Sequence, residues 1–467
     1  MKFTATALAL CVLLAAPTVT QRSEPDWPAI DAETLQHFQA LLRFDTSDPP
    51  GNEQPATDYL KQVLEREGLS VEIFALEGHR PNVVARLKGS GAQRPLLLMG
   101  HTDVVNVDPA RWTFPPFGAV RDGGYIYARG TLDDKDNLTA SLMVMLILKR
   151  LNVRLARDVI FLAEAGEEGS TQFGVEHVVN QHFPAIDAEY CLAEGGGVRR
   201  EGDQVQFAGV QTTEKIPRRI DLTATGVSGH ASMPLESNAL VHLASAIEKI
   251  ARWEAPIRLN ETTATYFQRL AEISPPEAAA RYRDVLVPGK VLEVDRYFRK
   301  AEPRHFALLH TTATPTIADS GYRINVIPSE AKASVDVRTL PNDDPAEMLE
   351  LVRAAIGDPA VRVEWGPRNE RPTGISRLDS EAFKAIEAAA TRQYGTVTIP
   401  MMGAGGTDMA YLRTRGVQCY GIGPAVDVED GPKGFGAHSD QERILERELY
   451  RFVRFNWDIV TSLAAAK

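Results

Sequence analysis

The sequence is poor in cysteine and has no excess of basic residues, and each shortage removes a class of protein. Three cysteines in 467 residues cannot build a disulfide scaffold or a cysteine-rich zinc module. A bound metal must therefore be held by histidines and carboxylates. The 51 lysines and arginines are outnumbered by 62 aspartates and glutamates, and the net charge of -11 has the wrong sign for binding a nucleic-acid backbone.

Long apolar runs are also lacking, except at the N-terminus. Lys2 precedes an apolar run over residues 3–16, and small residues follow at Thr18 and Thr20. This pattern is typical of a secretory signal peptide spanning residues 1–20, and the run is too short to cross a bilayer. We expect an exported protein, periplasmic or extracellular, without stable membrane insertion. An uncleaved membrane anchor and a lipid-modified Cys11 are the alternatives.

Strand-like and helix-like segments alternate over residues 26–214. Apolar runs at 158–163 and 190–193 are separated by a helical pattern at 173–181. Such alternation predicts an α/β sheet covered by helices. Cys191 falls in one of these strand-like runs and Cys419 in another, so we expect both to be buried free thiols.

The pattern changes after Glu214. Residues 215–369 contain two βαβ-like halves, separated by a long irregular stretch, about 255–316, that is rich in proline and arginine. The first pattern resumes over residues 370–467. We predict an α/β fold in which a mixed-sheet, three-layer domain (26–214 and 370–467) is interrupted by a smaller α+β domain.

One polar motif combines a histidine with a nearby carboxylate. An apolar strand ends at His101, and Asp103 follows two residues later. An imidazole ligand needs an acceptor on its second nitrogen, and a nearby aspartate is a usual partner. A single pair of this kind is common, so alone it does not establish a metal site.

Paired carboxylates follow at two further points. Asp133 and Asp134 lie in a turn that enters a helix, where an ordinary N-cap explains them equally well. Glu167 and Glu168 come directly after a buried strand. The carboxyl ends of such strands are where α/β folds place their sites. A functional role and ordinary solvent-exposed carboxylates therefore explain this pair equally well.

The last two motifs lie beside glycines. Glu194 ends an apolar strand and precedes Gly195, Gly196 and Gly197, while His438 lies in a glycine-rich loop before the last helix. Glycines allow the backbone to approach a ligand closely. With the preceding motifs, two histidines and several carboxylates reach one edge of the sheet. This is a ligand set for a pair of borderline divalent ions such as Zn²⁺.

In this order, the motifs resemble a family of co-catalytic di-zinc hydrolases that includes aminoacylases, glutamate carboxypeptidases, desuccinylases and related dipeptidases. The similarity covers nearly the whole chain after residue 20, including the inserted domain, which the resemblance identifies as a lid and dimerisation domain. The run at 112–117 (WTFPPF) followed by 130–135 (GTLDDK) is most similar to the carboxypeptidase S branch, which also contains N-acyl amino acid hydrolases. Gly166 and Ala128 depart from the family pattern, but neither departure removes a ligand. Asp136 replaces the usual glycine near the start of the helix.

The resemblance implies a role for each of these residues. Asp133 would bridge two Zn²⁺ ions, for which Co²⁺ or Mn²⁺ are possible substitutes. His101 and Glu194 would complete one metal site, and Glu168 and His438 the other.

The family pattern also implies residues that act around the metals. Glu167 would be the general base, Asp103 would hold His101, and Glu442 would support His438. In the lid, His230 would reach the active site of a partner subunit and stabilise the oxyanion there. The substrate would be bound by Asn325, Arg338, Gly406 and Thr407, with Arg338 clamping a free carboxylate.

We therefore predict an exported zinc-dependent hydrolase that forms a homodimer through its lid. It would cleave a peptide or N-acyl amino acid amide bond next to a free carboxylate. A non-catalytic binding protein stabilised by metals is one alternative, and the presence of Glu167 argues against it. A metal-dependent phosphoesterase is another, but the sequence lacks a basic phosphate cradle.

Overall fold

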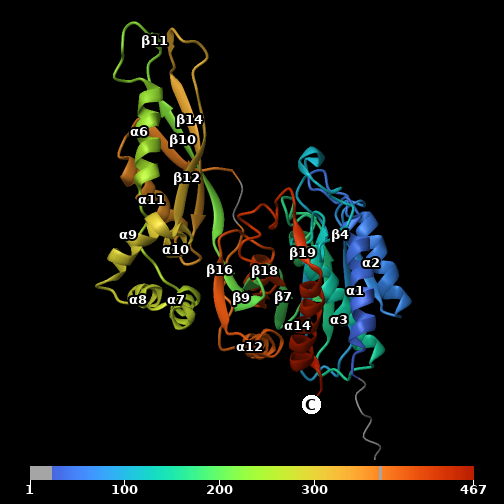
Figure 1. The fold of residues 1–467 in the computed structure, drawn as a ribbon. Helices are drawn as coiled ribbons and strands as arrows, with labels where there is room; N and C mark the ends of the chain where they lie inside the picture. Colours follow the sequence, from blue (N-terminus) through green and yellow to red (C-terminus); the bar gives the residue numbers. More distant parts are fainter. Residues whose placement is uncertain (1–23, 368–370, 467) are drawn as a thin grey trace, which may run out of the picture.

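A computed structural model describes residues 24–367 and 371–466 (Figure 1). The expected signal peptide and Cys11 lie outside the described residues. Figure 1 shows two bodies, a larger one that contains both ends of the described chain and a smaller one inserted between β9 and α12. Over the described ranges, no helix combines the length and apolar character needed to cross a membrane.

Helices and strands alternate along most of the chain. The helices are α1 (Trp27–Leu42), α2 (Gln54–Arg66), α3 (Lys135–Arg150), α4 (Val175–Gln181), α5 (Phe183–Ile186), α6 (Ala239–Arg252), α7 (Glu261–Ile273), α8 (Pro276–Asp284), α9 (Val291–Ala301), α10 (Pro303–Leu309), α11 (Pro345–Ile356), α12 (Glu381–Tyr394), α13 (Met409–Thr414) and α14 (Glu446–Ala464), with the short 3₁₀ helix η1 (Pro109–Arg111). The strands are β1 (Val71–Ala75), β2 (Pro81–Leu87), β3 (Leu96–His101), β4 (Val120–Asp122), β5 (Tyr125–Tyr127), β6 (Val159–Glu164), β7 (Tyr190–Ala193), β8 (Gly197–Glu201), β9 (Gln204–Glu214), β10 (Ile216–Thr225), β11 (Gly229–His230), β12 (Thr312–Ser320), β13 (Val326–Ile327), β14 (Glu330–Thr339), β15 (Val361–Trp365), β16 (Thr398–Gly403), β17 (Gln418–Gly421), β18 (Ala425–Asp427) and β19 (Arg443–Leu445).

The larger body is built on a ten-stranded mixed sheet. Its strand order is β1-β2-β6-β3-β7-β17-β9-β8-β18, and β16 pairs with β9. The central strands β6, β3, β7 and β17 are parallel, whereas β1 with β2, β2 with β6 and β9 with β17 are antiparallel. The carboxyl ends of β3, β6 and β7 therefore meet at one edge of the sheet, which positions the site described below.

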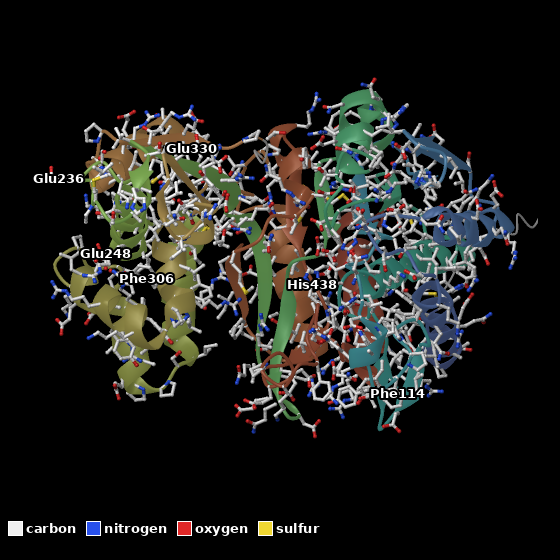
Figure 2. The ribbon with its side chains drawn as sticks, turned by 90° about the horizontal axis from the view of Figure 1, so that it is seen from above. Phe114, Glu236, Glu248, Phe306, Glu330 and His438 are labelled. Atoms are coloured by element: carbon white, nitrogen blue, oxygen red, sulfur yellow. The ribbon has the colours of Figure 1, made fainter. Side chains whose placement is uncertain are left out.

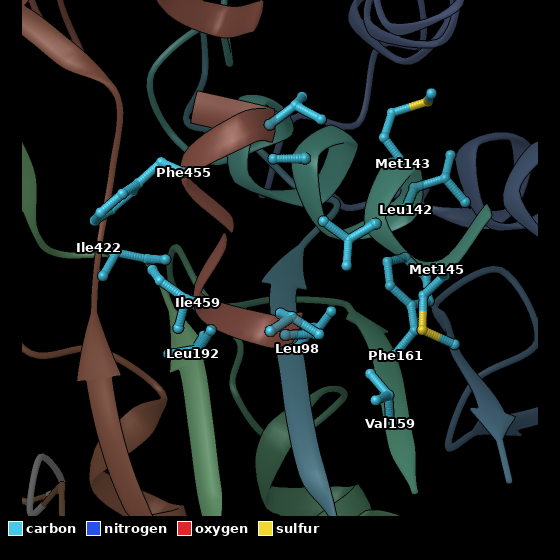
Figure 3. Close-up of a cluster of buried hydrophobic side chains, with 14 of the residues drawn as sticks. Leu98, Leu142, Met143, Met145, Val159, Phe161, Leu192, Ile422, Phe455 and Ile459 are labelled. Atoms are coloured by element: carbon cyan, nitrogen blue, oxygen red, sulfur yellow. The ribbon is translucent and has the colours of Figure 1, made fainter. Parts of the chain in front are cut away.

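Both faces of this sheet are buried. Along β3, Leu96 and Leu98 join the core under α1, α2, α3, α12 and α14, while Leu97 and Met99 join a second core under α4, α5 and α13. Alternate strand residues point to opposite faces, so a continuous apolar run is what a sheet covered on both sides requires. Figure 3 shows Leu98 in the first core, among side chains that include Leu192 of β7 and Phe161 of β6. The predicted mixed-sheet, three-layer α/β fold is confirmed.

The smaller body, here called the lid, has a four-stranded antiparallel sheet of order β12-β14-β10-β15. Strands of the first and the second βαβ-like half alternate in this sheet. Strands β14 and β15 are both antiparallel to β10, which lies between them, and β10 and β12 are both antiparallel to β14. Apolar side chains of α6 and α11 share a core with this sheet.

From its composition we expected the stretch 255–316 to be irregular. This expectation was wrong, because the stretch carries the four helices α7 to α10. Pro276 and Pro303 are the first residues of α8 and α10, where a missing backbone N–H costs no helical hydrogen bond. Asn260 and Thr263 form a capping box that starts α7. These helices, here called the lid insertion, share a core with Ile399 of β16, so they cover an edge strand of the main sheet.

Candidate active site

The predicted ligands lie at neighbouring strand ends. His101 is the last residue of β3, Glu168 follows the end of β6 in a tight turn, and Glu194 directly follows β7. Asp133 comes from the segment just before α3, and His438 from the loop between β18 and β19. Parallel pairing of β3 with β6 and β7 is what brings three of these side chains to one place.

The five side chains form two groups that share one carboxylate. His101 Nε2 lies 3.0 Å from Asp133 Oδ1, while His438 Nε2 lies 2.9 Å from Asp133 Oδ2 and 2.9 Å from Glu168 Oε1. One group is His101, Asp133 and Glu194, the other Asp133, Glu168 and His438, and within each group one ligand atom per residue lies within 4.8 Å of the others. Oxygen and imidazole nitrogen donors in this arrangement suit a pair of divalent ions.

The electrostatics of the site support the same interpretation. Burial raises the pKa of Glu194, and the negative charges of Asp133 and Glu167 raise it further. Burial also raises the pKa of Asp134 to about 8. Carboxylates are crowded here without enough positive charge from the protein, and bound dications would offset that repulsion. The residues present therefore fit a dinuclear metal centre.

Asp103 connects the two groups. His101 Nδ1 lies 3.0 Å from the backbone oxygen of Asp103 and 3.5 Å from its carboxylate. The same carboxylate accepts hydrogen bonds from the backbone N–H groups of Glu167 (3.2 Å) and Glu168 (3.0 Å). Burial alone would lower the pKa of His101, but its contacts with Asp103 and Asp133 raise it overall. One buried carboxylate thus orients an imidazole and the turn that carries two glutamates.

Glu442 holds the other side of the site. Its fully buried carboxylate accepts hydrogen bonds from Arg129 (2.6 Å) and from the backbone N–H of Leu132 (2.8 Å). Arg129 also donates to the backbone oxygen of His438 at 3.4 Å. His438 itself has a positive φ of 63°, a left-handed conformation that histidine adopts more readily than most residues. These contacts fix the segments before Asp133 and around His438 relative to one another.

Arg371 is a site residue that the sequence did not reveal. Its guanidinium donates to Glu167 Oε1 at 2.8 Å and to the backbone oxygen of Glu167 at 3.0 Å, and it lies 3.7 Å from Asp408. Burial raises the pKa of Glu167 to about 7, and Arg371 opposes that rise. A Cβ on Gly406 would lie 2.9 Å from the Arg371 side chain, so a glycine there allows this close approach. No motif surrounds Arg371, whereas Asp408 ends the Gly405–Asp408 motif.

Arg80 is a second residue that escaped the sequence analysis. It is buried and paired with Asp48 (2.8 Å) and Glu53, and Asp48 in turn accepts a hydrogen bond from Ser170 at 3.2 Å. Ser170 closes the turn that begins at Gly166. This buried ion network therefore supports the turn that carries the two glutamates.

Two predicted lid residues lie far from these groups within one chain. His230 in β11 is exposed, with Nδ1 2.7 Å from Ser232 Oγ, and the backbone oxygen of Asn325 accepts a hydrogen bond from Ala231. Figure 1 shows β11 at the end of the lid remote from the main sheet, and Figure 2 shows Glu236 at the outer rim of the lid, well separated from His438. The structure does not bring His230 and Asn325 to the metal groups of the same chain.

The remaining predicted substrate residues are engaged by protein groups. Arg338 on β14 pairs with Asp336 at 2.9 Å. The backbone N–H and the hydroxyl of Thr407 both donate to the Glu214 carboxylate at 2.8 Å. In the structure Thr407 therefore anchors the loop that contains Gly406, and roles of these residues toward substrate stay predictions.

A cavity opens on the metal groups. It has a volume of about 600 Å³, and its lining includes Asp133 and Glu194 from the groups themselves and Arg304 from the lid insertion. Both bodies thus contribute to the wall of the space in which a substrate would lie.

The sheet, the inserted lid and the site at the strand ends have the organisation of a peptidase-type hydrolase. Residues 97–461 match the sequence profile described as peptidase family M20/M25/M40, and the chain belongs to that family. The resemblance inferred from the sequence motifs is confirmed.

Individual relatives agree with this assignment. The chain is 29% identical over 316 residues to the "Probable carboxypeptidase S-like 2" of Dictyostelium discoideum, covering 66% of this chain but only 60% of that protein. It is 24% identical over 398 residues to "N-fatty-acyl-amino acid synthase/hydrolase PM20D1" of Homo sapiens, covering 83% and 76%. The crystal structure of the M20 family metallo-carboxypeptidase Sso-CP2 from Sulfolobus solfataricus shares the fold, with a TM-score of 0.68, 21% identity and coverage of 92% and 99%.

Proposed function

We propose that this family member is an exported, di-zinc hydrolase that cleaves a peptide or N-acyl amino acid amide bond next to a free carboxylate. The observation that carries the proposal is the pair of ligand groups joined through Asp133, with the carboxylate of Glu167 beside them but outside both groups. Ligands and a separate base are the parts that metal-assisted hydrolysis needs.

Two divalent ions, when bound, would supply Lewis acidity toward a water molecule and toward the scissile carbonyl. His101, Asp133 and Glu194 would hold one ion, and Asp133, Glu168 and His438 the other. Imidazole with carboxylate donors favours zinc over the harder Mg²⁺ or Ca²⁺, and Co²⁺ or Mn²⁺ can occupy such ligands as well.

Glu167 is suited to moving the proton. Its pKa of about 7, raised by burial, lies where a general base is most effective near neutral pH. It would accept a proton from the attacking water and deliver it to the leaving amine. Asp103 would keep both Glu167 and His101 in place through the hydrogen bonds described above.

The substrate class rests on the relatives and on the predicted carboxylate clamp. The relatives named carboxypeptidase S-like and N-fatty-acyl-amino acid synthase/hydrolase support a substrate with a free carboxylate beside the scissile amide. Arg338 would bind that carboxylate in place of Asp336, its present partner.

The exposed apolar surface near His230 supports a homodimer through the lid. Met233, Val241, Ile317 and Tyr322 are 63%, 61%, 61% and 86% exposed, and clustered exposed apolar side chains mark interaction surfaces. A partner subunit on this surface would allow His230 to act in the neighbouring active site. The N-terminal signal-like segment supports export.

The test is the Glu167→Gln variant of the zinc-loaded protein, assayed by amine release from a panel of dipeptides and N-acyl amino acids. We expect turnover to fall about 10³-fold, within the range for loss of a general base, while metal analysis still finds about two ions per chain. Glu168→Gln is the matched control, because it should lower metal content as well. Full activity in Glu167→Gln would refute the assigned mechanism, and no turnover of any substrate by the unmutated protein would favour the non-catalytic alternative.

A further inference from the structure

A second cavity adjoins the one that opens on the metal groups. It has a volume of about 300 Å³ and shares Gly195, Arg199 and Arg304 with the larger cavity. Gly195 directly follows the ligand Glu194, so the two cavities meet beside the metal groups. A substrate whose amide lies at the metals can therefore extend into this second space.

The two cavities differ in their acidic residues, although Arg199 and Arg304 line both. The larger one is lined by five acidic residues: Asp133, Asp134, Asp136, Glu194 and Asp427. The smaller one is lined by Arg199, Lys215 and Arg304 and by no aspartate or glutamate. Burial lowers the pKa of Lys215 to about 7, so the permanent charges of this cavity are the two guanidinium groups. In a chain of net charge -11, two arginines in a cavity to which no acidic residue of the described ranges contributes favour an anion.

The two arginines come from different bodies. Arg199 lies on β8 of the main sheet and Arg304 in α10 of the lid insertion. Across residues 24–367 and 371–466, neither guanidinium has a hydrogen bond or an ion pair with another residue. Burial, and then the positive charge of Arg304, lower the pKa of Arg199. Two like charges face one space without a protein counterion.

The neighbouring Arg200 shows what a structural arginine does in this strand. Its side chain is buried, and it donates to Asp427 at 2.9 Å and to the backbone oxygen of Gly202 at 2.7 Å. Arg199 points to the cavity without such partners. An arginine that serves the fold is paired, because an unpaired buried guanidinium is costly, so Arg199 is better explained by an external anion.

The other walls of the smaller cavity limit what that anion can be. Leu308 of the lid insertion and Met401 and Met402 of β16 provide apolar surface, and Lys215 lies buried at the junction of the two bodies. Apolar walls suit a short methylene chain, and two guanidinium groups suit a planar carboxylate, which each can bind with two hydrogen bonds. The combination fits a carboxylate at the end of an aliphatic arm.

We propose that Arg199 and Arg304 form a subsite for a second carboxylate of the substrate, separate from the one assigned to Arg338. The substrate is then a dicarboxylic N-acyl amino acid or dipeptide. This inference rests on the proposed hydrolase function and narrows it. The second carboxylate can belong to the acyl group or to the amino acid side chain, since both flank the scissile amide.

The experiment compares substrates that differ only in that charge. N-acetylglutamate is paired with N-acetylglutamine to place the charge on the amino acid, and N-succinylalanine with N-succinamoylalanine to place it on the acyl group. We expect kcat/KM of the zinc-loaded protein to favour the acid about 10- to 100-fold in one of the two pairs, as expected for charge-assisted hydrogen bonds. The pair that shows the preference identifies the source of the carboxylate.

Variants then assign the preference to the two arginines. Arg199→Gln and Arg304→Gln should each bring the acid-to-amide ratio close to one, and Arg304→Glu should invert it. Arg304 is exposed, so its substitution leaves the cores intact. The matched control is Arg296→Glu, an exposed arginine of α9 that lines neither cavity, and it should keep the preference of the unmutated protein.

Two kinds of result would overturn the subsite. One is a ratio near one, or a preference for the amide, in both substrate pairs. The other is an equal loss of kcat/KM on acid and amide substrates in the arginine variants. Such a loss would mean that the two arginines bind a carboxylate common to all substrates. Absence of turnover on every substrate would instead refute the hydrolase function. In that case, binding of N-acetylglutamate against N-acetylglutamine to zinc-loaded protein, measured by calorimetry, still decides on the subsite.

Discussion

The main sheet and the lid place their polar side chains in different ways. At the carboxyl ends of β3, β6 and β7, each candidate ligand is held by a neighbour, as Asp103 holds His101 and Glu442 holds the segment before Asp133. At the outer end of the lid, His230 is exposed, and among the described residues Ser232 is its side-chain partner. The first region brings its candidate ligands together within one chain, whereas the role that we propose for His230 in the second region requires another subunit.

This difference separates the chemistry from substrate selection. The strand ends supply ligands and a base with buried supports, so their geometry does not depend on what is bound. The lid supplies an exposed imidazole, His230, and an exposed guanidinium, Arg304, and the roles that we propose for both depend on a substrate or on a second subunit. We expect substitutions in the first region to affect all substrates, and those in the second to act through assembly or specificity.

The largest effect should follow from removing the shared ligand. Asp133→Asn weakens both ligand groups at once, so we expect bound metal to fall below one ion per chain and kcat/KM to fall about 10⁴-fold or more, because the Lewis acid is lost. Metal analysis and amine release measure the two quantities. Asp122→Asn, at an exposed position of β4, is the control. Retention of two ions would contradict the shared role of Asp133.

The lid should show its dependence on a second subunit in a mixing experiment. His230→Ala is expected to lower kcat about 10²- to 10³-fold, the usual loss for an oxyanion-stabilising group. Mixed with Glu167→Gln under conditions that allow subunit exchange, it should recover about a quarter of the full activity. Half of the dimers are then hybrids, each with one intact site.

Two outcomes would contradict the role of His230 in the active site of a second subunit. If the mixture stays inactive although the subunits exchange, His230 does not act across the interface. If His242→Ala, a control in α6 whose ring pairs with Asp358 at 2.7 Å, loses as much activity as His230→Ala, the effect is a general one on the lid.

A smaller effect is expected for the buried support of the metal groups. Asp103→Asn keeps the size of the side chain but weakens its hold on His101 and on the turn of Glu167 and Glu168, so we expect metal affinity or activity to fall about 10- to 100-fold. Titration with a metal-buffered assay measures both. Asp108→Asn, which changes an exposed cap of η1, should have no effect. A normal metal affinity and activity in Asp103→Asn would show that the support is dispensable.

The main-sheet site could be predicted because its signals are local. All candidate ligands except His438 lie at or after the end of an apolar strand or just before a helix. Parallel strands end at one edge, so the motifs around His101, Glu167 and Glu194 already pointed to one place. The three-layer fold followed from continuous apolar runs such as that of β3. Family resemblance then supplied the division of roles, which no spacing could have shown.

The lid and the junction between the bodies could not be predicted in the same way. The proline-rich stretch 255–316 was expected to be irregular, although Pro276 and Pro303 are the first residues of helices. Composition does not distinguish a first-turn proline from a helix breaker. Arg371 and Arg304 act through placement that depends on how the two bodies meet. Neither residue lies in a motif, and only the packing of the lid insertion on β16 brings Arg304 to the cavity.

The smallest effect is expected for the contact between Arg371, in the segment that follows the lid, and Glu167, the proposed general base. Arg371 opposes the rise in the pKa of Glu167 that burial causes, so Arg371→Gln should raise that pKa further, by about one unit. Glu167 works as a base only when ionised, and activity is lost as the pH falls through its pKa. The acidic limb of the kcat/KM profile should therefore move to higher pH, with a several-fold loss at pH 7 that disappears in alkaline solution. Arg377→Gln, an exposed arginine paired with Asp379 at 2.8 Å, should leave the limb in place. An equal loss of kcat/KM at every pH would mean that Arg371 only positions the glycine loop. The pKa of Glu167 would then be determined by groups of the main sheet alone.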